Sequence, residues 1–152
     1  MPITATGRTL EVQPDDRSAA TRLSVLHTKL EPPKARPGII ERPRLIDAAR
    51  ASGTSLVALI APAGYGKSSA MAQIARAEGR PLAWLSADAR DSDPATLARS
   101  LSASLSAIAP LPEGVVRAVE APGRSLWAVG IPRLASAVAG GDPITIAIDD
   151  VD

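Results

Sequence analysis

Between residues 61 and 68 the chain reads Ala61-Pro62-Ala63-Gly64-Tyr65-Gly66-Lys67-Ser68. An apolar run, residues 56–60, precedes this stretch, and a helical pattern of small and apolar residues, 69–75, follows it. An apolar strand, a glycine-bearing loop, Gly-Lys-Ser and a helix, in this order, are the context of a nucleotide-phosphate loop. The sequence therefore predicts a P-loop (Walker A motif) that opens a helix.

The residue types of this loop fit phosphate chemistry. Glycines at 64 and 66 let the backbone turn its N–H groups toward phosphate oxygens, which a Cβ would obstruct. The Lys67 ammonium can reach the β- and γ-phosphates, and the Ser68 hydroxyl can ligate Mg²⁺. The helix that follows points its positive end at the anion. The predicted ATP-binding residues of the loop are Pro62, Ala63, Gly64, Tyr65, Gly66, Lys67, Ser68 and Ser69.

One position departs from the usual pattern of Gly, four residues and Gly-Lys-Ser/Thr. The first glycine is replaced here by Ala61. The alternative interpretation is an ordinary strand-to-helix turn that happens to contain Gly-Lys-Ser. The flanking strand and helix patterns favour the phosphate loop.

A second motif lies at residues 144–150, Ile-Thr-Ile-Ala-Ile-Asp-Asp. The β-branched apolar run predicts a buried parallel strand that closes on two carboxylates, as in a Walker B motif. Asp149 is the predicted second Mg²⁺ ligand beside Ser68. Asp150 stands where many P-loop ATPases carry a glutamate that polarises water, and it is the candidate catalytic residue. An aspartate is one methylene shorter than glutamate, and a plain polar strand end is the alternative for the pair alone.

The remaining pattern alternates strands and helices. We expect strands at 55–60, 81–86 and 144–150, and helices at 44–51, 67–78, from Pro94 onward and at 131–139, with a loop at 109–124. A leucine stripe, Leu97, Leu101, Leu105 and Ile108, predicts one core-facing helix side. This order predicts an α/β fold with a parallel sheet and the ligand at the carboxyl ends of its strands.

The composition excludes several kinds of site and partner. The chain has no cysteine, so disulfides and cysteine-based metal sites are excluded. Its one histidine, His27, is a poor candidate ligand on its own, and a net charge of +1 favours neither nucleic acid nor membrane. The first residues lack the apolar core of a signal peptide, and no apolar run approaches the ~20 residues of a membrane span. We expect a soluble, cytoplasmic protein without a membrane partner.

Four stretches together resemble the N-terminal part of the large ATP-binding LuxR-family transcriptional regulators, the MalT-like signal-transduction ATPases with numerous domains. They are the lead-in Thr28–Pro33 with Gly38–Leu45, the loop 62–68 with its tyrosine, Trp84–Asp88 with Asp91–Pro94, and Ile146–Asp150. The resemblance covers residues 28–152. The tyrosine-bearing loop matches the family's own variant of the motif.

The resemblance implies further roles. In the family the segment before the first strand packs against adenine, which maps onto Ile40, Glu41 and Arg42; the alternative for Arg42 is a solvated helix-start residue. It also implies an ATP/ADP switch in which a small-molecule inducer and ATP favour self-association, while a C-terminal helix-turn-helix binds DNA. Such a module is at most a slow ATPase.

These observations predict three parts. Residues 1–27 form a flexible extension, 28–54 a proline-rich lead-in with a short helix on the adenine side, and 55–152 a partial P-loop NTPase domain. The sheet is expected to be incomplete, because in this class the strand between the two motif-bearing strands comes later in the chain. The alternatives to a regulator module are a stand-alone P-loop kinase or NTPase and a non-functional remnant of a truncated gene.

Overall fold

The computed structural model describes residues 27–34, 37–121 and 123–151. Its elements, in chain order, are η1 (His27–Leu30), α2 (Pro43–Ala51), α3 (Lys67–Glu78), β1 (Leu82–Ser86), η2 (Ala89–Ser92), α4 (Pro94–Ile108), α5 (Glu113–Glu120), η3 (Leu126–Gly130), α6 (Ile131–Ala139) and β2 (Thr145–Asp149). Apart from His27, the expected extension at 1–27 lies outside the described residues.

The sheet of the described residues has two parallel strands. β1 pairs with β2 in a register that runs from Leu82 opposite Thr145 to Ser86 opposite Asp149. The ladder continues one step beyond the strands, because the Ala87 amide donates to the Asp149 carbonyl at 2.8 Å. A parallel pair needs a long crossover, and here α4, α5, η3 and α6 supply it. The mixed helix and strand content and the parallel pairing confirm the α/β expectation at this level.

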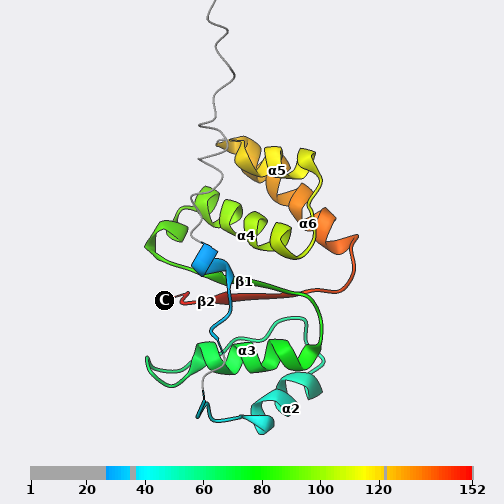
Figure 1. Ribbon diagram of the computed structural model, residues 1–152. Helices are drawn as coiled ribbons and strands as arrows, with labels where there is room; N and C mark the ends of the chain where they lie inside the picture. The colour runs from blue at the N-terminus through cyan, green and yellow to red at the C-terminus, as the bar shows by residue number, and fades with distance from the viewer. Residues whose placement is uncertain (1–26, 35–36, 122, 152) are drawn as a thin grey trace, which may run out of the picture.

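Helices cover both faces of the sheet (Figure 1). The crossover helices α4, α5 and α6 lie on one face, and α3 lies on the other with α2 beyond it. Both strands run in one direction, so their carboxyl ends meet at one side of the molecule. Figure 1 shows the loop before α3 on that same side. The layers therefore bring the two predicted motifs to a common edge.

Local sequence sets the helix boundaries. Asp93 caps α4: its carboxylate accepts from the Thr96 amide at 2.9 Å and from the Thr96 hydroxyl at 2.8 Å. Pro94 follows at the first helical position, where a missing N–H costs nothing. α3 ends at Gly79, whose φ of 68° is left-handed and favours glycine. The predicted bounds of α3 and α6 agree with the structure.

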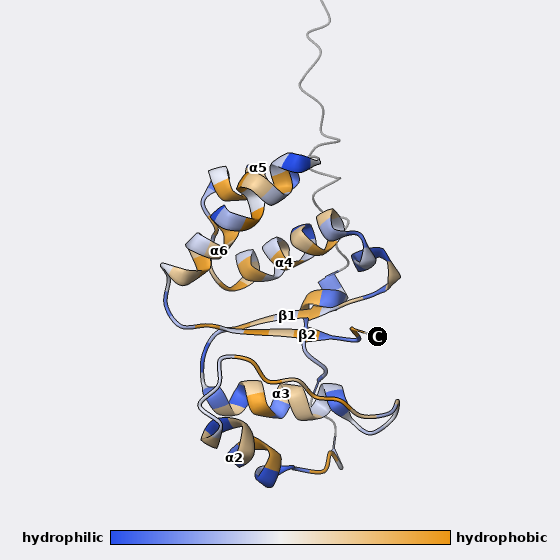
Figure 2. Cartoon of the chain, turned by 180° about the vertical axis from the view of Figure 1, so that it is seen from behind, coloured by the Kyte–Doolittle hydropathy of each residue, from blue (hydrophilic) through white to orange (hydrophobic). Residues whose placement is uncertain are grey.

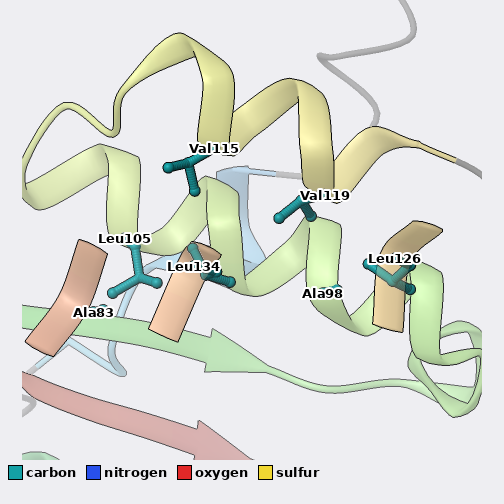
Figure 3. Close-up of a cluster of buried hydrophobic side chains, with 7 residues drawn as sticks. All are labelled: Ala83, Ala98, Leu105, Val115, Val119, Leu126 and Leu134. Carbon is teal, nitrogen blue, oxygen red and sulfur yellow. The ribbon is translucent and has the colours of Figure 1, made fainter. Parts of the chain in front are cut away.

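Two apolar clusters hold the layers together. The larger lies between β1 and the crossover helices and is drawn in Figure 3: Ala83, Ala98, Leu105, Val115, Val119, Leu126 and Leu134. The smaller joins the opposite face of the sheet to α3 through Ala72, Trp84 and Ala147. Of the predicted leucine stripe only Leu105 is fully buried. The other three members are partly buried, and small residues of α4 take the closest contacts to the sheet.

The packing of η3 against α5 depends on a glycine. A Cβ on Gly130 would lie 2.6 Å from the Ala118 carbonyl oxygen, a backbone atom that cannot move away alone. We expect Gly130→Ala to lower the free energy of unfolding by about 2 kcal/mol through overpacking. Urea denaturation measures this loss. Gly114→Ala is the control, because its Cβ meets only a side-chain tip at 4.0 Å and should leave stability unchanged or raise it by about 0.5–1 kcal/mol; equal losses in the two variants would contradict the steric explanation.

A buried ion pair joins η1 to the turn after β1. The Lys29 ammonium lies 2.5 Å from Asp91 and 3.1 Å from Asp88. Asp91 also accepts from the Asp88 amide at 2.8 Å and from the Ser100 hydroxyl at 2.9 Å. Only 2% of the Asp91 side chain and 11% of the Lys29 side chain are exposed. This lysine–aspartate cluster therefore anchors the start of the described chain to the carboxyl side of β1.

The pKa values of this cluster follow from its contacts. Burial by itself would raise the pKa of Asp91, but hydrogen bonds from Lys29, the Asp88 amide and Ser100 outweigh it and lower the pKa. Burial opposes the charge on Lys29 as well, yet its bonds to the two carboxylates raise the lysine pKa. Hydrogen bonds from Arg90 are the main reason why the pKa of Asp88 is lowered. All three groups are therefore charged at neutral pH.

The prediction of a strand at 55–60 is wrong for the structure. This stretch forms no ladder in the described part of the chain, and Figure 2 shows it as an apolar trace that runs along α3. Leu56 is 83% exposed and Ile60 94% exposed. A strand exists only through hydrogen bonds to a neighbour, and β2 pairs with β1 instead. The stretch is apolar, but no strand in the described part of the chain pairs with it.

The prediction of a loop at 109–124 is also wrong, because α5 lies inside it. Val115 and Val119, four residues apart, are both buried and form the inner side of this helix. Pro112 stands just before the helix, where proline is harmless, and Gly114 lies in its first turn. Tertiary burial of the two valines outweighs the weak helix propensity of this segment.

Candidate nucleotide-binding site

The predicted phosphate loop is exposed and contains two glycines in the left-handed conformations expected of an anion cradle. Gly64 has φ of 80° and Gly66 has φ of 75°, both left-handed conformations that side chains rarely adopt. A Cβ on Gly64 would meet nothing within 4 Å, so this glycine faces open space. The loop residues from Pro62 to Tyr65 are exposed. The loop can therefore be reached by a ligand.

The N-terminus of α3 adds donors to this cradle. The Ala70 amide makes an intrahelical bond to the Gly66 carbonyl at 2.9 Å. The amides of Lys67, Ser68 and Ser69 precede it in the first turn, where N–H groups have no intrahelical acceptor. They carry the positive end of a helix of 12 residues. Free amides, a helix dipole and a lysine at one point make a site that favours anions.

The Lys67 side chain lies across the loop. Its ammonium donates to the Ala61 carbonyl at 2.9 Å, and the residue is partly buried. Ala61, the position that departs from the usual motif, thus contributes through its backbone, which alanine offers as well as glycine. A phosphate group could replace this carbonyl as the acceptor with a stronger, charge-assisted bond.

The carboxylates of the second motif end β2. Asp149 is 7% exposed and stands at the carboxyl end of the strand. Asp150 follows it, exposed, with φ of 57°, and is the one non-glycine residue with positive φ in the described part of the chain. α3 packs against β2, so the Gly-Lys-Ser turn and the aspartates belong to neighbouring elements. Figure 1 places the carboxyl end of β2 and the loop before α3 on one side.

Ser68 and Asp149 are the residues that the sequence predicts as magnesium ligands. Ser68 and Asp149 offer oxygen atoms, which this hard cation prefers, but two ligands alone do not complete its octahedron. Across residues 27–34, 37–121 and 123–151, no group of three or more His, Cys, Asp or Glu side chains could hold a metal ion. The remaining ligands would come from phosphate oxygens and water, as is usual for Mg²⁺ in nucleotide sites.

Arg42 connects the lead-in to the phosphate loop. Its guanidinium donates to the Tyr65 carbonyl at 2.7 Å and lies 3.2 Å from the position of a Cβ on Gly66. Its own carbonyl accepts from the first amides of α2, at Leu45 and Ile46. Arg42 is exposed and directly precedes α2, as the helix-start alternative has it, and it also contacts the loop. Its expected contact with adenine stays a prediction.

A shallow pocket of about 360 Å³ opens between the lead-in and the loop. Its lining consists of Ile39, Ile40, Arg42, Gly64, Tyr65, Gly66 and Ser69. Ile40 and Tyr65 expose 78% and 64% of their surface, so apolar and aromatic faces meet the open space. A planar base beside the phosphate loop would find apolar contacts here.

Sequence reasoning missed Gln73, which lies on α3. Its side-chain oxygen accepts from the Arg42 amide at 2.9 Å, and its side-chain nitrogen donates to the Ile40 carbonyl at 3.1 Å. The local sequence of this helix gives no sign that its glutamine contacts a segment more than 30 residues earlier in the chain. Only the folded chain reveals this pairing.

Within the described residues, no helix combines the length and the apolar character that crossing a membrane requires. Comparison with protein-family models, with curated proteins and with solved structures finds no match for this chain.

Proposed function

We propose that the chain is the Mg-ATP-binding switch module of a MalT-like, LuxR-family transcriptional regulator, built on a P-loop NTPase fold. The observation that carries the nucleotide-binding part is the pair of left-handed glycines, Gly64 and Gly66, directly before the α3 N-terminus with Lys67 in its first turn. The regulator part is supported by the sequence resemblance over residues 28–152. DNA binding, an inducer and ATP-dependent self-association belong to the full-length regulator in this proposal, which also makes it cytoplasmic.

In this proposal, different elements of the fold bind different parts of Mg-ATP. Backbone N–H groups among residues 63–69 and the Lys67 ammonium would hold the phosphates, while Ser68 and Asp149 would hold the metal ion. The metal ion would neutralise phosphate charge and orient the β- and γ-phosphate oxygens. Arg42 and the lead-in form the base side of the site. Asp150, exposed beyond β2, is the candidate to orient water in slow hydrolysis.

The direct test is calorimetric titration of the full chain with ATP, once in the presence of Mg²⁺ and once in the presence of EDTA. Saturable one-to-one binding that strengthens with Mg²⁺ is the expected result. Absence of heat and of competition against a fluorescent ATP analogue would overturn the nucleotide-binding proposal. Inorganic tripolyphosphate, which has the charge but no base, separates phosphate binding from base binding.

The metal role of Asp149 gives a further prediction. Asp149→Asn removes the anionic ligand while keeping its size, and we expect Mg-ATP affinity to fall about tenfold. ATP affinity in EDTA should stay the same, because no metal is then held. Asp142→Asn, in the exposed turn before β2, is the matched control and should change neither affinity. A loss of the same size in EDTA would show that Asp149 does not act through a metal.

A further inference from the structure

The lead-in between Pro37 and Leu45 is held to the phosphate-loop helix without a hydrophobic core. Every residue in that range is exposed, and none of the described residues 27–34 and 37–51 is buried. Side-chain hydrogen bonds join the lead-in to α3 and the loop. The bond from Arg42 to the Tyr65 carbonyl and the two bonds of Gln73 fix it beside the pocket, while a longer 3.4 Å contact joins Arg76 to the Pro33 carbonyl upstream.

Gln73 contacts the lead-in as a neighbouring strand would. An amide side chain offers one acceptor and one donor, and here they meet the Arg42 N–H and the Ile40 C=O. In extended backbone these two groups point to the same side, and those of Glu41 point to the other side. Gln73 thus holds one edge of the segment on α3.

From this geometry we infer that Gln73 is a positioning residue: its side-chain amide docks residues 40–42 on α3 and so fixes the pocket wall that receives the nucleotide base. The inference rests on the proposed function for the base, but the docking itself does not. Segments held by a few exposed hydrogen bonds open locally at low free energy. Removal of both Gln73 bonds should therefore free the wall and leave the phosphate loop in place.

The first measurement is amide hydrogen exchange of the full chain by NMR. Gln73→Met keeps the length of the side chain and removes both bonds, so the Arg42 amide should exchange about tenfold faster. Arg76→Met, one turn later on the same helix, removes only the contact to Pro33 and should change the rate by less than about twofold. Unchanged exchange in the Gln73 variant, or equal acceleration in both, would overturn the docking role.

The second measurement separates the base from the phosphates. In the Gln73→Met variant, Mg-ATP should bind about tenfold more weakly, and Mg-tripolyphosphate with nearly unchanged affinity, because only the base contacts the wall. An equal loss for both ligands would show that Gln73 acts on the loop and would overturn the assignment. If the wild-type chain binds neither ligand, the proposed function fails, and hydrogen exchange still decides the docking role.

Discussion

Lys67→Ala is expected to abolish tight binding of Mg-ATP. The ammonium is the positive charge that the loop motif itself carries, and it bonds the Ala61 carbonyl at 2.9 Å. Charged hydrogen bonds contribute about 1.5–3 kcal/mol each. The loss of one such bond should weaken binding about 10- to 150-fold, since each 1.4 kcal/mol is tenfold. Calorimetric titration with Mg-ATP measures the change.

A matched variant controls for charge. Lys34→Ala removes an equal charge from an exposed part of the lead-in and should alter Mg-ATP affinity by less than about twofold, because exposed charges are screened by salt. The thermal midpoint of the Lys67 variant shows whether its fold is intact. If its ATP affinity equals that of the wild type, Lys67 does not bind phosphate and the assignment of this loop fails.

Lys29→Met is expected to produce the largest loss of stability. It leaves the Asp91 carboxylate, whose side chain is 2% exposed, without its counter-ion. Breaking a buried pair by removing one partner costs about 3–5 kcal/mol, so we expect the free energy of unfolding to fall by about 3 kcal/mol. Urea denaturation at neutral pH measures it. Lys34→Met is the control and should have almost no effect, because its side chain is exposed.

The double variant Lys29→Met/Asp91→Leu tests the cause. It removes the stranded charge together with the lysine, so much of the lost stability should return. The remaining deficit reflects the Asp88 amide and the Ser100 hydroxyl, which then lose their acceptor. A double variant no more stable than Lys29→Met alone would show that the ion pair is not the source of the loss.

The same cluster determines a pH dependence. Folding lowers the pKa of Asp91 below 3.8. The stabilisation that its charge gives to the fold is therefore complete above pH 3.8 and is lost as the pH falls through the pKa of the folded state. Folding raises the pKa of Lys29 above 10.5. The stabilisation that its charge gives to the fold is therefore complete below pH 10.5 and is lost as the pH rises through the pKa of the folded state. The stability difference between wild type and Lys29→Met should therefore be largest between about pH 4 and 10 and shrink on both sides.

Local signals in the sequence were enough to place most elements. Gly-Lys-Ser and Gly79 bracket α3, and Asp93-Pro94 starts α4. Pro132 in the first turn and Gly140 after the last residue bracket α6. Each signal depends on chemistry within a few residues. The two short strands also follow from their β-branched and apolar runs. Sequence reasoning placed Lys67 at the start of a helix and Asp149 at the end of a strand, as the structure has them. Arg42 came from the family resemblance, and its role stays a prediction.

The errors arose where distant contacts decide the structure. Residues 55–60 have the composition of a strand, but a strand needs a partner, and no property of the segment itself supplies one. α5 was missed because Pro112 and Gly114 carried more weight than the four-residue spacing of Val115 and Val119. The contacts of Gln73 and Lys29 reach 31 and 62 residues along the chain, beyond any local pattern.

The most direct test of the account is an NMR titration of the isotope-labelled chain with Mg-ATP. The account predicts saturable shifts of backbone amides centred on Gly64, Gly66, Lys67 and Ser68, with further changes at Arg42 and Asp149. Inorganic tripolyphosphate should reproduce the changes in the loop and leave Arg42 almost unaffected. Shifts that centre on another part of the chain, or no shifts at saturating nucleotide, would contradict a nucleotide site at the start of α3.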